Sequence, residues 1–120
     1  MPAAGQGDAQ LVVVSVSFGS AEDAAAAATA LVEQRLVACA QSWPMRSSYR
    51  WQGAVEHADE QLLTAKTTAA MLPAVEAAVR ALHSYDVPEM IAVPVTWASA
   101  DYAAWVRESV GPALPPSELR

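Results

Sequence analysis

Basic residues and cysteine are both scarce in this chain. Its 120 residues contain seven lysines and arginines against thirteen aspartates and glutamates, which gives a formal net charge of −6. Proteins that bind a nucleic-acid backbone carry a basic surface, so this charge balance argues against a nucleic-acid partner. The single cysteine, Cys39, cannot form a disulfide within the chain, which favours a reducing compartment.

Long apolar runs are also lacking. The first residues, MPAAGQGDAQ, have neither a positively charged start nor an apolar segment, so they differ from a secretory signal peptide. No apolar run approaches the roughly 20 residues that a membrane-spanning helix needs. We therefore expect a soluble, cytoplasmic protein without a membrane partner.

Apolar residues are nevertheless plentiful, at 53% of the chain, and four of them are tryptophan. Many of the others are alanine, as in DAAAAATAL, and alanine buries little area. Large aromatic side chains dominate the energetics of cores and interfaces. A small, alanine-rich domain with several tryptophans is thus expected to complete its core through contact with other subunits.

Strand-like and helix-like segments alternate along the chain. The β-branched run LVVVSVS is apolar at nearly every position, which indicates a central, buried strand. Ser20 followed by Asp23 resembles a capping box at the start of a helix. We predict, in order, a strand over 11–17, a helix over 20–36, a strand over 36–43, a hairpin over 46–56, a returning strand over 60–68, a helix over 72–84, a strand over 89–97 and a short helix after Ser99.

Prolines and glycines refine this pattern. Pro44 and Met45 are expected to interrupt the second strand, and Gln52-Gly53 to form the hairpin turn. Pro94 cannot donate to a neighbouring strand, so the last strand should lie at an edge or bend there.

The order of elements predicts an α+β fold, a ferredoxin-like βαββαβ sandwich with a long central hairpin and a short C-terminal helix. We expect one domain over residues 10–110. Residues 1–9 should form a disordered N-terminal segment, and residues 111–120 a C-terminal tail.

Few motifs carry recognisable chemistry. The turn after the first strand, SFGSAED, has one glycine and two acidic residues, which is a poor phosphate site. Cys39 lies between alanines and is more easily explained as a small buried residue than as a nucleophile. No serine has a histidine at a catalytic spacing, so we predict that the chain is not an enzyme.

Two groups of potential metal ligands stand out. His83 is close in sequence to Asp86 and Glu89, and His57 lies near Asp59 and Glu60. Neither group has the spacing of an established metal motif. His83 also ends a predicted helix, where an imidazole interacts well with the helix dipole without any metal. Both explanations of His83 remain open at this point.

Several segments together resemble the CutA-type divalent-cation tolerance proteins. They are LVEQRLVACAQSW, SSYRWQGAVE, LLTAKTT, LHSYDVPEMIAVPV and DYAAWVRESV, and the resemblance extends over residues 11 to 110. It implies a ferredoxin-like fold in a tight homotrimer whose long hairpins pair across subunits. It also implies a role in the response to divalent metal ions, above all copper, with no required cofactor and no established enzymatic activity.

The copper ligands described in the family transfer only in part. The cysteine position falls on Val16 and the two histidine positions on Leu82 and His83. Valine and leucine cannot coordinate a metal, and a lone imidazole makes a weak site. We therefore expect weak, reversible binding of Cu(II) or another divalent cation, with His83 and nearby carboxylates such as Glu89 as the ligands.

A second set of family positions is fully retained. The resemblance places it in a cleft between subunits, and it consists of Cys39, Trp51, Glu60, Lys66, Tyr85, Tyr102 and Trp105. These side chains could line a pocket for a small ligand or could anchor the interface. The first reading supports an alternative function, a PII-like trimeric sensor that binds a small anionic or aromatic metabolite through Lys66 and Trp51. The second supports a structural, partner-binding trimer.

Overall fold

The computed structural model describes residues 6–112, and its elements follow the predicted order. They are α1 (Gln6–Ala9), β1 (Leu11–Phe18), α2 (Ala21–Glu33), β2 (Cys39–Trp51), β3 (Ala54–Thr68), a 3-10 turn (Ala69–Met71), α3 (Leu72–Leu82), β4 (Met90–Pro94) and α4 (Ala100–Ser109). The short α1 replaces the disorder that we expected over its four residues. The rest of the expected N-terminal segment, and residues 113–120 of the expected tail, lie outside the described residues.

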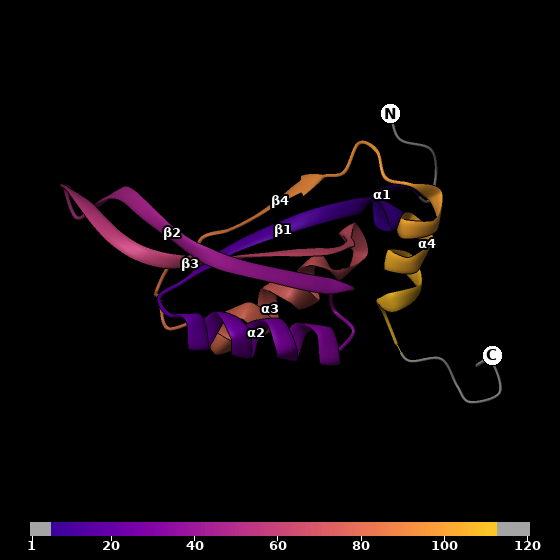
Figure 1. Cartoon of the computed structure of the whole chain (residues 1–120), viewed down its shortest axis with the longest axis horizontal. Coiled ribbons are helices and arrows are strands. Elements are labelled where there is room, and N and C mark those ends of the chain that lie inside the picture. Colours follow the sequence, from indigo (N-terminus) through magenta and orange to yellow (C-terminus); the bar gives the residue numbers. More distant parts are fainter. Residues whose placement is uncertain (1–5, 113–120) are drawn as a thin grey trace.

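The four long strands form one antiparallel sheet in the order β2-β3-β1-β4. Each β-α-β connection therefore joins two strands that are not neighbours in the sheet. β3 lies between β1 and β2, and β1 lies between β3 and β4. Helices α2 and α3 cover the same face of the sheet, and α4 lies at the end opposite the tip of the β2–β3 hairpin (Figure 1). An α+β fold with one antiparallel sheet is thus confirmed.

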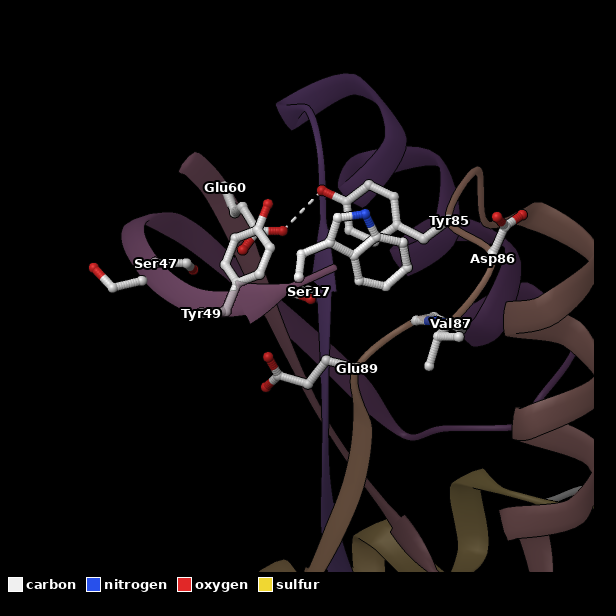
Figure 2. Close-up of a pocket in the computed structure, with 11 residues that line it drawn as sticks. Ser17, Ser47, Tyr49, Glu60, Tyr85, Asp86, Val87 and Glu89 are labelled. Carbon is white, nitrogen blue, oxygen red and sulfur yellow. Dashed lines mark hydrogen bonds between the residues drawn. The ribbon is translucent and has the colours of Figure 1, made fainter. Parts of the chain in front are cut away.

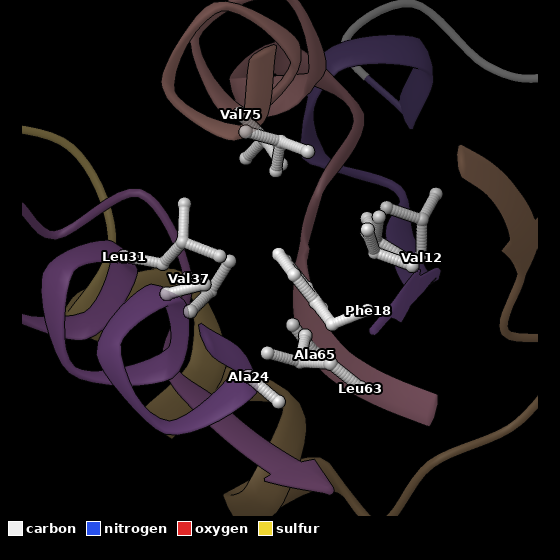
Figure 3. Close-up of a cluster of buried hydrophobic side chains, with 12 residues drawn as sticks. Val12, Phe18, Ala24, Leu31, Val37, Leu63, Ala65 and Val75 are labelled. Carbon is white, nitrogen blue, oxygen red and sulfur yellow. The ribbon is translucent and has the colours of Figure 1, made fainter. Parts of the chain in front are cut away.

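The main core lies between this sheet face and the two helices. Val16 pairs with Leu63 and Val14 with Ala65, so these residues of β1 and β3 point to the same side. Figure 3 shows side chains from both helices meeting them there. The fully buried members are Val14, Val16, Phe18, Ala24, Ala27, Leu31, Val37, Leu63, Ala65, Val75 and Val79. β1, which supplies three of them, is an interior strand as predicted.

Helix α2 begins as the sequence indicates, because the Ser20 side chain accepts a hydrogen bond from the backbone N–H of Asp23 at 3.1 Å. The spacing of its apolar residues predicts that Ala24, Ala28, Leu31 and Val32 share the inner face of this helix. Ala27 is buried, whereas Val32, which we placed on the inner face, is exposed. Leu82 at the end of α3 is likewise exposed.

The β2–β3 hairpin is longer and more regular than predicted. β2 runs without a break from Cys39 through Pro44 to Trp51, so the expected interruption at Pro44 was wrong. β2 is an edge strand, and an edge strand tolerates a residue that lacks an N–H on its free side. The hairpin extends beyond the helices that cover the rest of the sheet (Figure 1), where Gln52 and Gly53 turn the chain with positive φ angles.

Among residues 6–112, no such helical layer covers the opposite face of the sheet. Ile91 and Val93 of β4 pair with Ser15 and Val13 of β1 on this face, and both are half exposed. Trp97, in the loop after β4, is 80% exposed. Helix α4 packs only at the end of this face, through a small cluster of Val106 with Leu11 and Ala38. A substantial apolar surface is therefore left open on one protomer.

Candidate functional site

A cavity of about 520 Å³ opens between the hairpin and the loop that joins α3 to β4 (Figure 2). The β2–β3 hairpin, the end of β1 and this loop build it. The hairpin contributes four residues of β2 and one of β3, the end of β1 contributes one, and the loop contributes five. They are Ser47, Ser48, Tyr49, Trp51, Glu60, Ser17, Tyr85, Asp86, Val87, Pro88 and Glu89.

Glu60 and Tyr85 form the polar centre of this cavity. The Tyr85 hydroxyl donates to Glu60 Oε2 at 2.8 Å, and Glu60 is only 9% exposed. Burial, the hydrogen bond to Glu60 and the charge of that carboxylate raise the pKa of Tyr85 to about 12. The phenol therefore stays protonated at neutral pH and can donate its hydrogen bond to the Glu60 carboxylate.

A glycine makes room for the Tyr85 ring. A Cβ atom at Gly19 would lie 3.2 Å from the Tyr85 hydroxyl oxygen, closer than an ordinary van der Waals contact. The absence of a side chain at this position thus helps to set how deeply the ring sits beside β1.

The charge of the cavity has one sign. Glu60, Asp86 and Glu89 line it, and none of the lining residues is a lysine, an arginine or a histidine. The aromatic rings of Tyr49, Trp51 and Tyr85 complete much of the remaining wall. A site of this composition favours a cation over an anion.

His83 is adjacent in sequence but does not line the cavity. Its Nε2 donates to the backbone carbonyl of Ser17, and its Nδ1 accepts the backbone N–H of Tyr85 at 3.1 Å. The ring also stacks on Phe18 with the centroids 4.5 Å apart. Both ring nitrogens are thus occupied, and the imidazole joins the end of α3 to β1.

The residues of this protomer do not fit a strong metal centre. Among residues 6–112 no group of three or more histidine, cysteine, aspartate or glutamate side chains lies close enough to hold an ion. Val16 is buried in the core and Leu82 carries no ligand atom. Of the two metal ligands that we predicted, Glu89 reaches the cavity, whereas His83 would first have to give up a backbone hydrogen bond.

The other predicted cleft residues form a separate group near α4. Cys39 Sγ lies 3.5 Å from the Tyr102 hydroxyl, and the rings of Tyr102 and Trp105 are 5.7 Å apart. The contact with Cys39, together with burial, raises the pKa of Tyr102 to about 12. Lys66 pairs across the strands with Cys39, and its Nζ donates to Gln41 Oε1 at 2.7 Å.

The seven predicted cleft residues are therefore split between two places on one protomer. Trp51, Glu60 and Tyr85 meet at the cavity, and the rest belong to the group near α4. Glu60 and Lys66 lie six residues apart on β3, a separation of roughly 20 Å along a strand. A lysine on a strand is expected to point to solvent or to pair with a carboxylate such as Glu60 or Glu89, but the hydrogen-bond partner of Lys66 is the amide of Gln41.

Sequence reasoning missed several cavity residues. Tyr49 alternates with Trp51 and so shares its strand face, a signal that could have identified it. Ser17 gave no such signal, because the sheet register brings it in; Asp86 was noted only as a neighbour of His83 and Glu89 in the sequence. The sequence also concealed a pair on the hairpin, where Ser48 and His57 face each other with 2.7 Å between Oγ and Nδ1. No carboxylate of the described residues bonds this imidazole, so we regard it as a cross-strand pair.

The chain matches the family model of the CutA1 divalent ion tolerance protein over residues 12–109. It is 44% identical over 100 residues to the divalent-cation tolerance protein CutA of Thermus thermophilus, an alignment that covers 82% of this chain and 97% of that one. It is 37% identical over 99 residues to the chloroplastic protein CutA of Arabidopsis thaliana, again over 82% of this chain, but spans only 54% of that relative.

Solved structures agree with this match. The Thermus thermophilus divalent cation tolerance protein superposes with a TM-score of 0.83 at 43% identity, over 84% of this chain and 99% of that one. The periplasmic divalent cation tolerance protein CutA of Archaeoglobus fulgidus superposes with a TM-score of 0.82 at 30% identity, over the same two shares. Among the described residues, no helix has the length and apolar character needed to cross a membrane.

Proposed function

The chain belongs to the family of CutA1 divalent ion tolerance proteins, and from this we propose that it acts by binding, not by catalysis, as a cytoplasmic homotrimer in the response to divalent cations. One observation carries the proposal: three carboxylates and no basic side chain line the cavity described above. Oxygen ligands of this kind bind divalent cations reversibly, and more weakly than a cluster of cysteine and histidine does.

Glu89 is the ligand that the geometry supports best. It lines the cavity at the start of β4, whereas the backbone already engages both nitrogens of His83. If His83 takes part, metal binding must break its contact with Tyr85 or with Ser17. His83 would then be a weaker metal ligand than a free imidazole, because the free energy of the lost hydrogen bond is subtracted from the metal–imidazole interaction.

Two features support a trimer with the ferredoxin-like arrangement. The β4 face carries exposed Ile91 and Val93, and the hairpin extends past the helices. A monomeric protein rarely leaves such an apolar surface open. The two groups of cleft residues, separated on one protomer, would form one cleft if the cavity of one subunit met the α4 end of the next. The strand order β2-β3-β1-β4 is that of a split βαβ fold.

Static light scattering tests the assembly. We expect a mass about three times the 12.6 kDa of the chain at micromolar concentration. A stable monomer under these conditions would overturn the interface argument.

Calorimetric titration with Cu²⁺ in a weakly coordinating buffer tests the metal proposal. We expect weak binding that Glu89→Gln reduces severalfold. Glu56→Gln is the matched control, because Glu56 is a glutamate of the hairpin beside the cavity but does not line the cavity. His83→Ala separates the two ligands: an unchanged isotherm places binding at the carboxylates alone. Equal isotherms for native protein, Glu89→Gln and His83→Ala would refute the proposed site.

No observation favours the metabolite-sensing alternative in its original form. It places a small anionic or aromatic metabolite between Lys66 and Trp51, which lie at different ends of one chain and would meet only across a subunit boundary. Lys66 is also engaged with Gln41. The cavity beside Trp51 carries the wrong charge for an anion.

A further inference from the structure

We propose that the cavity between the hairpin and the loop of residues 85–89 binds a small organic ammonium ion, with an N–H directed at Glu60 and alkyl groups against the aromatic walls. This inference shares the cavity with the proposed function but depends on different features of it. The metal proposal needs carboxylate oxygens alone. The ammonium proposal needs Glu60 together with the aromatic rings.

The first argument is the state of Glu60. Its carboxylate is nine-tenths buried and has one partner among the described residues, the neutral hydroxyl of Tyr85 on Oε2. Its other oxygen has no hydrogen bond within residues 6–112, and no side-chain oxygen there is both fully buried and unbonded. Oε1 is therefore not fully enclosed by the described residues, and Glu60 is one of the residues that line the cavity. A carboxylate in this position gains most from a charged donor.

The second argument is the aromatic wall. Tyr49 and Trp51 belong to β2 and Tyr85 belongs to the facing loop, so both the hairpin and the loop bring aromatic rings to the cavity. Figure 2 shows the rings of Tyr49 and Tyr85. An ammonium ion with alkyl groups is attracted to the faces of such rings and also buries its apolar atoms against them. A strongly hydrated metal ion gains little from the same rings.

Size and geometry support the same ligand class. A volume of about 520 Å³ is within the range of roughly 300–1,000 Å³ for small-molecule sites. It far exceeds the space that one metal ion fills, and the described residues offer no cluster of three ligands to surround such an ion. Asp86 and Glu89 at the cavity wall add negative charge, which raises the local concentration of cations.

The test is a titration of the full chain with n-butylammonium chloride in phosphate buffer, which contains no amine. Chemical shifts or calorimetry report binding, and 1-butanol is the uncharged analogue with the same number of heavy atoms. We expect saturable binding of butylammonium and at least tenfold weaker binding of 1-butanol. A titration with sodium chloride controls for ionic strength.

Three variants locate the site. Glu60→Gln keeps an acceptor for Tyr85 and removes only the charge, and it should weaken binding at least tenfold. Trp51→Leu should weaken binding about two- to thirtyfold if the indole supplies a cation–π contact. Trp43→Leu is the matched control, since Trp43 lies on the same strand with similar exposure but does not line the cavity. Light scattering on each variant checks that its assembly is unchanged.

Any of several results would overturn the proposal. These are the absence of saturation, equal binding of 1-butanol, or no loss of affinity in Glu60→Gln. Binding that appears only in Lys66→Met would show that a lysine of a neighbouring copy fills the cavity. Because Trp51→Leu leaves every carboxylate in place, it should not affect the Cu²⁺ titration. The ammonium proposal and the metal proposal can therefore fail independently.

Discussion

Replacing Tyr85 by phenylalanine removes one hydroxyl and tests the polar centre of the cavity directly. The ring and its packing beside Gly19 remain, but the 2.8 Å hydrogen bond to the buried carboxylate of Glu60 is lost. A hydrogen bond to a charged group contributes about 1.5–3 kcal/mol to stability. The cavity is open, so water can reach part of the carboxylate once the hydroxyl is gone. We therefore expect a loss of about 1.5 kcal/mol, at the low end of that range.

Urea unfolding followed by tryptophan fluorescence measures this loss. The protomer concentration must be held constant, because assembly contributes to the apparent stability of an oligomer. Tyr49→Phe is the control: this tyrosine lines the same cavity, but it is Tyr85 that bonds Glu60. We expect a change below about 0.5 kcal/mol for it.

A double-mutant cycle isolates the interaction itself. In the Glu60→Gln background the hydrogen bond becomes a neutral one, so Tyr85→Phe should then cost only about 0.5–1 kcal/mol. The reasoning is refuted if Tyr85→Phe destabilises no more than Tyr49→Phe. It is also refuted if its cost is the same in both backgrounds, because the charge of Glu60 would then play no part.

Three further predictions concern the same region and the start of α2. Gly19→Ala should destabilise the protein by about 1 kcal/mol, because the new Cβ would press on Tyr85; Gly7→Ala, which meets open space, should be neutral or slightly stabilising in the same urea assay. Spectrophotometric titration at 295 nm should place the ionisation of both Tyr85 and Tyr102 near pH 12, and Tyr→Phe variants at each position should remove that part of the absorbance change. Because these pKa values are raised in the folded state, the associated stability is present below about pH 10 and falls as the pH rises towards 12. The assignment is contradicted if Tyr85→Phe or Tyr102→Phe removes an absorbance step near pH 10. Ser20→Ala should cost about 1 kcal/mol in thermal or urea unfolding through the lost helix cap, and no loss would show that the cap is dispensable.

The order and type of the elements were predictable because the signals are local. The run LVVVSVS has the β-branched, apolar composition of a buried strand, and β1 is indeed an interior strand. Pro94 indicated an edge strand, and β4 lies at an edge. Pro44 was misread, because a proline is compatible with a strand only when that strand is at an edge. The position of a strand within a sheet depends on pairing between distant segments, which periodicity does not reveal.

The ends of the helical stripes were predicted less well, for a related reason. Val32 and Leu82 occur at the correct spacing for the inner face, yet both are exposed. Leu82 is the last residue of α3, and Val32 directly follows the buried Leu31 in the last turn of α2. The hydrophobic pattern gives the direction of the inner face, but it does not decide which side chains at the margin of that face are covered.

Part of the candidate site also followed from the sequence. The resemblance grouped Trp51, Glu60 and Tyr85, and the structure brings these three together at one cavity. The state of His83 was not accessible, because one of its two partners is the carbonyl of Ser17, 66 residues away in the chain. Carboxylates nearby in the sequence suggest that a histidine is a metal ligand. Its other contacts in the fold decide whether its ring nitrogens are available to a metal.

The prolines of the two outer strands have a consequence for aggregation. Pro44 lies within β2 and Pro94 ends β4, so each free edge of the sheet has a residue that cannot donate a hydrogen bond. An incoming strand could pair with a short part of either edge but not along its whole length. The edges thus permit limited contacts between a few copies and oppose the continuous strand-by-strand addition that builds fibrils.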